Sequence, residues 1–273
     1  NFDIEGHPSM ANEMTAAFAE LRTRARFQNP LMQISFCHVI FPADPNLRRG
    51  YDIVSLIQRD LVDFIMVMAY DMNWIRTECV ENATSCWDPT QEPGVGNIPR
   101  PNAPIRGILA GINQYESMGI PAAKLVVGLP WYGYTSECRT DNAGDACEMP
   151  CDGANMTDCA RVSKQMPFKE IAVLLATGAS TTGVVYDAPS ASAWADYIDP
   201  MSLRRHRVWF DTPDTLAIKM AALRQVGVRG VGFWESGSLQ YEDNGSNGSE
   251  SAVSQTQEMW DAIAAFAAST KHY

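Results

Sequence analysis

The chain has 273 residues, 46% hydrophobic and 19% charged, which is enough for one large or two small globular domains with a sizeable core. Its net charge of −11 argues against a nucleic-acid backbone or an anionic membrane surface as a partner. Phe64–Tyr70, the longest apolar run, has the length of a strand and not of a membrane-spanning helix.

The chain opens on two acidic residues, Asp3 and Glu5, which alternate with apolar ones. Residues i and i+2 of an extended strand point to the same side, so the two carboxyl groups are presented together. Like charges held close raise one pKa, and glycoside cleavage needs a carboxylic acid that keeps its proton. Two solvated acids at a strand end are the alternative interpretation.

Alternating helical and strand patterns follow. The residue before the first helix, Ser9, is predicted to be its N-cap. Before its terminal Asp71, the last strand of this half contains a single polar residue, Asp63, which is typical of a strand buried on both faces of a parallel sheet. The predicted elements are a helix over Ser9–Arg26, a strand over Leu31–Phe41, a short helix over Tyr51–Leu61 and a strand over Val62–Asp71.

In the second half, apolar residues repeat at helical spacing from Ile105 to Tyr115, with Pro104 at the start and Gly119 past the end. The other predicted elements are a strand over Leu125–Tyr134, a helix opened by Thr212-Pro213 and ended by Gly227, a strand over Val228–Trp234 and a closing amphipathic helix from Val253 to Ala267.

This order predicts an α/β fold with a parallel sheet and helices outside it, and functional groups at the carboxyl ends of the strands. The residues there are Glu5, Asp71, Trp131, Tyr132 and Trp234. Four strands are strongly predicted, whereas a closed barrel needs about twice that number.

The long connection from Thr135 to Arg229, about 100 residues, exceeds a single crossover. It contains two short strand patterns, Val184–Tyr186 and Arg207–Phe210. A small α+β insertion is therefore expected there.

Seven cysteines and four N-glycosylation sequons, at Asn82, Asn155, Asn244 and Asn247, indicate a location outside the cytosol. Disulfides of a lysosomal or secreted protein are favoured over a metal site, because the cysteines lack paired zinc-ligand spacing and accompanying histidines. Cys37, in an apolar strand pattern, is the candidate for a buried, reduced thiol. The other cysteines are Cys138, Cys147, Cys151 and Cys159 in one loop and Cys79 and Cys86 in another.

Four motifs in chain order resemble the strand ends of the chitinase-type (family 18) glycoside hydrolases, most of all the di-N-acetylchitobiase branch. The motifs are Asp3-Ile-Glu5, Val67-Met-Ala-Tyr-Asp71, Leu125-Val-Val-Gly-Leu-Pro-Trp-Tyr-Gly-Tyr134 and Gly230-Val-Gly-Phe-Trp234. The family's signature strand reads Asp-x-x-Asp-x-Asp-x-Glu, and here only its tail is present, with Asn1 at the second Asp position.

The resemblance implies a TIM (β/α)8 barrel without its first three strands. Residues 1–273 would form a partial catalytic barrel, with residues 135–212 as an insertion within it. The chain is accordingly expected to be an N-terminally truncated segment that folds poorly and is inactive alone, since half a barrel exposes strand edges.

The resemblance also implies substrate-assisted retaining hydrolysis of N-acetylglucosamine oligosaccharides, with no cofactor and no metal. Glu5 would be the general acid and base, Asp3 would hold the acetamido N–H, and Tyr70 would contact the acetamido carbonyl. The residues implied to bind the sugar are Asp71, Trp234, Trp131 and Tyr132. A monomer is expected.

Other interpretations remain open. Tyr70, Asp71, Trp131 and Trp234 could be ordinary core or turn residues. Asp3, Glu5 and His7 could form a metal triad, although Pro8 would end their strand at once. The chain could also belong to an inactive, carbohydrate-binding chitinase-like protein or to an endo-chitinase.

Overall fold

The computed structural model describes residues 8–42, 51–72, 98–144, 146–150 and 163–269. The chain divides into two compact units, one of residues 1–70, 108–129 and 223–232, the other of residues 71–107, 130–222 and 233–273. Within the described ranges, no helix has both the length and the apolar character needed to cross a bilayer.

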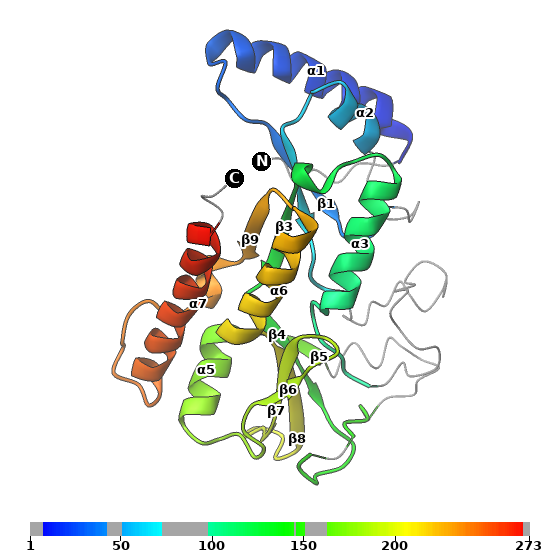
Figure 1. Ribbon diagram of the computed structural model, residues 1–273. Helices are drawn as coiled ribbons and strands as arrows, with labels where there is room; N and C mark the ends of the chain where they lie inside the picture. Colours follow the sequence, from blue (N-terminus) through cyan, green and yellow to red (C-terminus); the bar gives the residue numbers. More distant parts are fainter. Residues whose placement is uncertain (1–7, 43–50, 73–97, 145, 151–162, 270–273) are drawn as a thin grey trace. The chain divides into compact units, whose positions relative to one another are not determined.

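The first unit is built on a four-stranded sheet in the order β1-β2-β3-β9 (Figure 1). β1 pairs parallel with β2, and β2 pairs parallel with β3. The elements that lie wholly or partly in this unit are η1 (Pro8–Met10), α1 (Ala11–Gln28), β1 (Ser35–Val39), α2 (Ile53–Gln58), β2 (Phe64–Met68), α3 (Ile105–Ser117), η3 (Ala122–Lys124), β3 (Leu125–Pro130) and β9 (Gly230–Trp234).

These four strands lie where the apolar runs predict them, but β2 is not buried on both faces. Ile65 and Val67 are fully buried, whereas Phe64, Met66 and Met68 are intermediate. The prediction of a strand covered on both sides is therefore wrong for one face in this structure.

Two details of the first unit also differ from the sequence-based prediction. Leu31 is 86% exposed and β1 begins only at Ser35, because residues 30–31 form a turn. Ser9 is not the N-cap of α1, since it lies in the 3-10 turn η1 and Met10 occupies the cap position without a side-chain hydrogen bond. By contrast, α2 has a capping carboxylate, because Asp52 accepts a hydrogen bond from the Ser55 N–H.

Polar contacts in the first unit join α1 and α3 to the sheet. Arg22 of α1 donates to Asp63 at 3.0 Å, and Asp63 also accepts the Ile34 N–H at 2.6 Å. The buried Tyr115 hydroxyl donates to the Val39 carbonyl at 2.6 Å and lies 2.8 Å from His38 Nδ1. Because a hydroxyl has one hydrogen, His38 Nδ1 carries the hydrogen of that second bond.

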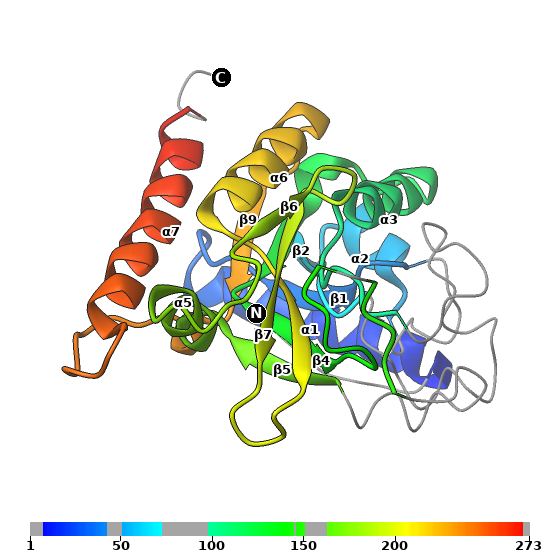
Figure 2. The same ribbon diagram turned by 90° about the horizontal axis from the view of Figure 1, so that it is seen from below.

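The second unit contains a five-stranded sheet in the order β5-β4-β8-β7-β6, in which neighbouring strands pair antiparallel (Figure 2). α5 packs against α7, as both views show. The elements lying wholly or mostly in this unit are β4 (Tyr132–Glu137), β5 (Ser163–Pro167), α5 (Phe168–Ala176), β6 (Val185–Asp187), β7 (Ser192–Ile198), β8 (Arg205–Phe210), α6 (Pro213–Val226), η4 (Ser236–Ser238) and α7 (Ser249–Ser269).

The strand predicted over Leu125–Tyr134 is two strands that belong to different sheets. β3 ends at Pro130, which has no N–H, and β4 begins at Tyr132. The backbone of Trp131 between them is bonded elsewhere, since its N–H donates to the Trp234 carbonyl at 2.7 Å and its carbonyl accepts the Phe168 N–H at 3.1 Å. The prediction of one continuous strand is therefore wrong.

A buried charge cluster joins β7 and β8. The carboxylate of Asp196 accepts from Arg207 Nε at 2.7 Å and from Arg205 Nη1 at 2.9 Å, and Asp196 and Arg205 have no exposed side-chain surface. Burial favours protonation of Asp196, but the Arg207 guanidinium and the Gly144 N–H outweigh it and hold the pKa of Asp196 below its usual value.

One disulfide, Cys138–Cys147, closes the loop after β4, and Arg205 donates to Thr140 and Ala146 of that loop. This bears out disulfide bonding for two of the predicted cysteines, while Cys79, Cys86, Cys151 and Cys159 lie outside the described residues. Cys37 carries a thiol as expected, but it is partly exposed and not buried.

The predicted barrel does not close within the described residues, where the parallel sheet has four strands. An antiparallel sheet does occur between β3 and β9 in the chain. The domain assignment, with residues 135–212 as an insertion in a partial barrel, stays a prediction.

Candidate functional site

Two of the sequence-predicted site residues, Asp3 and Glu5, lie outside the described residues, as does the neighbouring His7. Tyr70 follows β2 in the first unit and is partly buried. Its ring passes over Gly128 of β3, where an added Cβ would lie 3.3 Å from Tyr70 Cε1. The absence of a side chain at position 128 thus leaves room for the Tyr70 ring.

In the second unit, Asp71 is held in an unusual backbone conformation. Its φ is +57°, in the left-handed region that non-glycine residues enter at a cost. Asn102, which is 3% exposed, accepts the Asp71 N–H on its side-chain oxygen at 2.7 Å and the Met72 N–H on its carbonyl at 3.1 Å. The Asn102 amide nitrogen donates to the Tyr132 carbonyl at 3.2 Å, which ties this turn to β4.

The Asp71 side chain is fixed by two phenols from β4. Tyr132 and Tyr134 both donate to Asp71 Oδ1, at 2.5 and 2.8 Å. Because these two tyrosines are two residues apart on a strand, they point to the same face of the sheet. Within the described part of the chain, the two phenols bond to Oδ1, and no hydrogen bond to Asp71 Oδ2 occurs. We call Asp71, Asn102, Tyr132 and Tyr134 the Asp71 cluster.

The electrostatics of the cluster keep Tyr132 in its donor form. Burial, and then the negative charge of Asp71, raise the pKa of Tyr132 well above its usual value. The phenol therefore stays protonated at any pH in which the protein works. A carboxylate with one oxygen held by two phenol donors is a rigid acceptor, which suits the recognition of hydroxyl or amide groups.

The two predicted tryptophans differ in exposure. Trp131 is 2% exposed and stacks on Phe233, with ring centroids 4.6 Å apart, and Trp260 approaches its edge at 5.1 Å. Trp131 is thus a packing residue in this structure. Trp234, by contrast, is 51% exposed at the end of β9. An exposed indole at a strand end offers an apolar surface, and the sugar-binding role of Trp234 stays a prediction.

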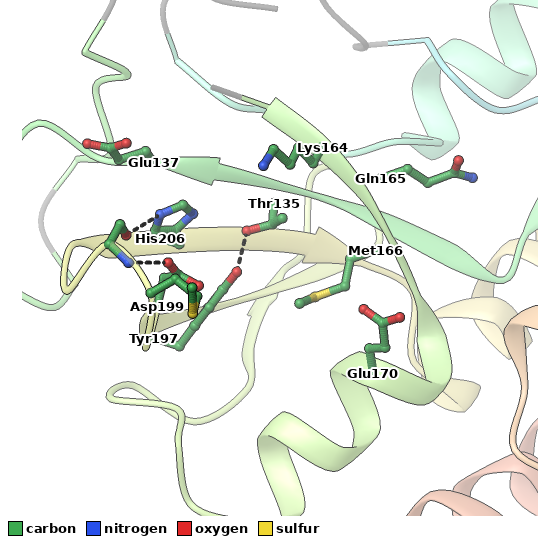
Figure 3. A pocket seen from close by; sticks show the side chains of 11 residues that line it. Thr135, Glu137, Lys164, Gln165, Met166, Glu170, Tyr197, Asp199 and His206 are labelled. Carbon is green, nitrogen blue, oxygen red and sulfur yellow. Dashed lines mark hydrogen bonds between the residues drawn. The ribbon is translucent and has the colours of Figure 1, made fainter. Parts of the chain in front are cut away.

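A second candidate is a cavity of about 520 Å³ in the second unit (Figure 3). Strand register places Thr135, Glu137 and His206 on the face opposite to Tyr132 and Tyr134, because adjacent residues of a strand point to opposite sides. The cavity therefore lies on the other face of the antiparallel sheet from the Asp71 cluster. Its lining residues are Thr135, Glu137, Lys164, Gln165, Met166, Glu170, Tyr197, Asp199, Met201, Ser202 and His206.

Three hydrogen bonds join polar groups of this cavity to one another. The hydroxyls of Thr135 and Tyr197 lie 2.8 Å apart, and Ser202 contacts both Asp199, through its N–H, and His206 Nε2, through its hydroxyl. The hydrogen bond from the Ser202 N–H holds the pKa of Asp199 below its usual value, and burial lowers the pKa of His206. The cavity is open, and Met201 at its rim is 91% exposed.

Two members of the Asp71 cluster are not among the predicted site residues. Tyr134 could have been found from its spacing to Tyr132, since the two share a strand face. Asn102 had no comparable signal, because it is remote from both strands in the chain. Among the described residues, no group of three or more acidic, histidine or cysteine side chains could hold a metal ion. Asp3, Glu5 and His7, the alternative metal triad of the sequence analysis, are outside them.

The family model "Glycosyl hydrolases family 18" matches residues 1–238, a range that includes Asp3, Glu5, the Asp71 cluster and Trp234. The chain belongs to glycosyl hydrolase family 18. Mouse (Mus musculus) di-N-acetylchitobiase is 33% identical over 271 residues, which cover 96% of this chain and 66% of the mouse protein. The chain therefore spans just under two thirds of that relative's length.

Solved structures support the family fold. A chitinase-like agglutinin from Robinia pseudoacacia is similar with a TM-score of 0.61 and 17% identity, over 93% of this chain and 66% of the agglutinin. A class V chitinase from Nicotiana tobaccum in complex with NAG4 has a TM-score of 0.59 and 17% identity, over 89% of this chain and 63% of that chain. Together with the family match, these similarities indicate a TIM-barrel-like α/β fold.

Proposed function

We propose that the protein containing this chain hydrolyses β-1,4-linked N-acetylglucosamine oligosaccharides, either chitobiose cores or chitin oligomers. The observation that carries the proposal is the family 18 match over residues 1–238, in which the acidic residue Glu5 is retained. The clamped carboxylate of Asp71 and the exposed indole of Trp234 support it, because both suit a sugar ring. The mouse relative is named a di-N-acetylchitobiase, which favours short oligosaccharides.

In the proposed mechanism, the acetamido oxygen of the substrate attacks C1 while the glycosidic bond breaks, which gives an oxazolinium ion. Glu5 transfers its proton to the departing oxygen and then, as a carboxylate, takes a proton from the water that attacks C1. Asp3 accepts the acetamido N–H and stabilises the positive charge that develops. The Tyr70 hydroxyl orients the acetamido carbonyl.

The remaining groups bind and position the sugar. Asp71 Oδ2 accepts a sugar hydroxyl or amide, and the Trp234 indole forms the apolar floor. Tyr132 acts through Asp71, by holding the carboxylate in one orientation. Trp131 supports the segment by packing, since its ring is covered by Phe233 and Trp260. We further propose a monomer that works in a lysosomal or secreted location, in line with the Cys138–Cys147 disulfide.

The test is release of N-acetylglucosamine from a chitooligosaccharide by the full-length protein at mildly acidic pH. Glu5→Gln keeps the shape but removes the transferable proton, so we expect the rate to fall at least about 100-fold. Inhibition by a thiazoline analogue of the oxazolinium ion would support attack by the acetamido group. Equal rates for the unsubstituted protein and Glu5→Gln would show that Glu5 is not the general acid. A trapped glycosyl-enzyme ester would refute attack by the acetamido group.

A carbohydrate-binding protein without catalysis is the second candidate, and the similarity to the Robinia agglutinin favours it. Binding of the chitooligosaccharide without any turnover by the full-length protein would select this alternative. An endo-chitinase would instead release internal fragments from long polymers. The sizes of the first products, separated chromatographically, distinguish the two hydrolases.

A further inference from the structure

Two consecutive sequons lie just before and at the start of α7, and the structure distinguishes them. Asn244 pairs with Ser246 and Asn247 pairs with Ser249 in the sequence Asp243-Asn-Gly-Ser-Asn-Gly-Ser-Glu250. The segment is the loop that projects beyond the N-terminal end of α7, drawn in orange in Figures 1 and 2. Two acceptor residues this close together compete for one bulky oligosaccharide, so the local structure of each sequon matters.

The first sequon is fully accessible. Asn244, Gly245 and Ser246 are all exposed. The Asn244 side-chain oxygen accepts both the Ser246 N–H, at 3.0 Å, and the Ser246 hydroxyl, at 2.6 Å. These two bonds engage the carbonyl oxygen and not the amide nitrogen, to which a sugar would be attached. Within the described residues, no hydrogen bond from Asn244 Nδ2 occurs.

The second sequon ends in the packed first turn of α7, although Asn247 itself is exposed. Ser249 is 1% exposed, its hydroxyl accepts the Asn244 N–H at 3.1 Å, and its own N–H donates to the Ser246 carbonyl at 3.0 Å. Gly248 has a φ of +84°, and a Cβ there would lie 3.1 Å from Thr177 Cγ2. Presenting Asn247 with an extended, accessible Ser249 would therefore require the first turn of α7 to open.

We infer that Asn244, and not Asn247, carries an N-linked oligosaccharide in the mature protein. The step joins Asn244 Nδ2 to C1 of the first sugar of a lipid-linked oligosaccharide; the bond from C1 to the lipid pyrophosphate breaks, the lipid pyrophosphate leaves, and the amide loses one proton. The order of synthesis also favours Asn244, because Asn244 is synthesised before Asn247. An oligosaccharide on Asn244 then blocks the modification of Asn247. The inference rests on the secreted or lysosomal location and not on hydrolase activity.

The experiment uses the full-length protein, secreted from a glycosylating eukaryotic cell. Cleavage after Glu242 and Glu250 isolates the segment Asp243–Glu250, with both sequons in one peptide. Enzymatic removal of the oligosaccharide in heavy-oxygen water converts the linked asparagine to labelled aspartate. Fragmentation of the peptide in a mass spectrometer then locates the label. We expect it at position 244.

Matched variants complete the test. Ser246→Ala removes the first sequon but keeps Asn244, and it should abolish the label at 244; Asn247→Gln removes only the second sequon and should leave that label unchanged. Label at 247 in the unsubstituted protein, or an unlabelled peptide from secreted protein, would overturn the inference. Loss of hydrolase activity in any preparation would bear on the proposed function alone, since the readout here is chemical modification.

Discussion

The two units of this chain are stabilised by different kinds of contact. The first depends on apolar strands, and its Asp63–Arg22 ion pair leaves the carboxylate side chain 27% exposed. The second contains charge pairs without solvent contact, such as Asp196 with Arg205 and Lys219 with Asp211. Buried pairs of this kind stabilise little overall, but they penalise any arrangement that separates them. We therefore expect that replacing a charged residue lowers the free energy of unfolding more in the second unit, which holds Asp71, than in the first.

The largest expected effect comes from Asp196→Ala. This change leaves Arg205 and Arg207 without their shared carboxylate, and an uncompensated buried charge costs about 3–5 kcal/mol. Urea denaturation of the full-length protein, followed by fluorescence, measures the loss in the free energy of unfolding. Asp196→Asn, which keeps the shape, covers the case in which the alanine variant does not fold.

The matched control in the first unit is Asp63→Ala. Asp63 likewise pairs with an arginine and a backbone N–H, those of Arg22 and Ile34, but water reaches its carboxylate. We expect a loss of about 1.5–3 kcal/mol, the range for hydrogen bonds to a charged group. An Asp63→Ala variant less stable than Asp196→Ala would contradict the contrast between the two units.

The next effect concerns activity and tests whether polar contacts in the second unit position the site. Tyr134→Phe removes one of the two phenol donors to Asp71 and keeps the ring, so kcat/KM should fall about tenfold while stability changes little. Separate kcat and KM values from initial rates would place the loss mainly in kcat, because Asp71 is then held less firmly at the reacting sugar.

Tyr186→Phe is the control for this experiment, since Tyr186 lies on β6 and is 50% exposed. Its kinetics should equal those of the unsubstituted protein. Unchanged kcat and KM in Tyr134→Phe, or a loss matched by unfolding, would show that the phenol does not position Asp71.

The smallest effect is a pH dependence of stability from His206. Burial lowers the pKa of His206 below 6.5, although Asp199 and Glu137 favour its charged form and Lys164 opposes it. The unfolded chain then binds the proton more readily, so stability is unaffected above pH 6.5 and is reduced as the pH falls through the folded-state pKa. The loss should not exceed about 0.5 kcal/mol, because solvent screens a partly exposed ring.

Thermal melts of the unsubstituted protein and His206→Gln across this pH range measure the difference. The variant should lose less stability on acidification. A parallel pH dependence in the two proteins would assign the change to the aspartates alone, whose lowered pKa values also make stability fall in acid.

The sequence predicts the first unit well because its strands are continuous apolar runs. The end of β3 could not be predicted from apolar residues, since Leu125–Tyr134 has the pattern of one continuous strand. Only the backbone hydrogen bonds of Trp131 show that the chain passes from one sheet to the other there. α5 and β7 were also missed. β7 contains Asp196, a charge in the middle of a strand, which looks unfavourable until its arginine partners on β8 are known.

The candidate site shows the same limit. Tyr70, Asp71 and Trp234 were recognised from motifs, and the structure places Asp71 and its phenol partners together. The hydrogen bond from the Asp71 N–H to the Asn102 side chain joins residues 31 positions apart, and no local sequence pattern reveals such a contact. Trp131 is predicted as a wall of the sugar site, and in the structure its ring stacks on Phe233. Its position in the motif does not tell an exposed ring from a stacked one.

The left-handed backbone at Asp71 decides which substitutions can report on that carboxylate. Alanine is disfavoured at a φ of +57°, so its kinetics would mix a distorted turn with a missing charge. Asparagine accepts this conformation and has nearly the same shape, so it removes the charge alone. Glycine would relieve the strain and delete the side chain while the turn persists. Asparagine and glycine, compared with each other, would therefore separate what the carboxylate does for the sugar from what it does for the loop.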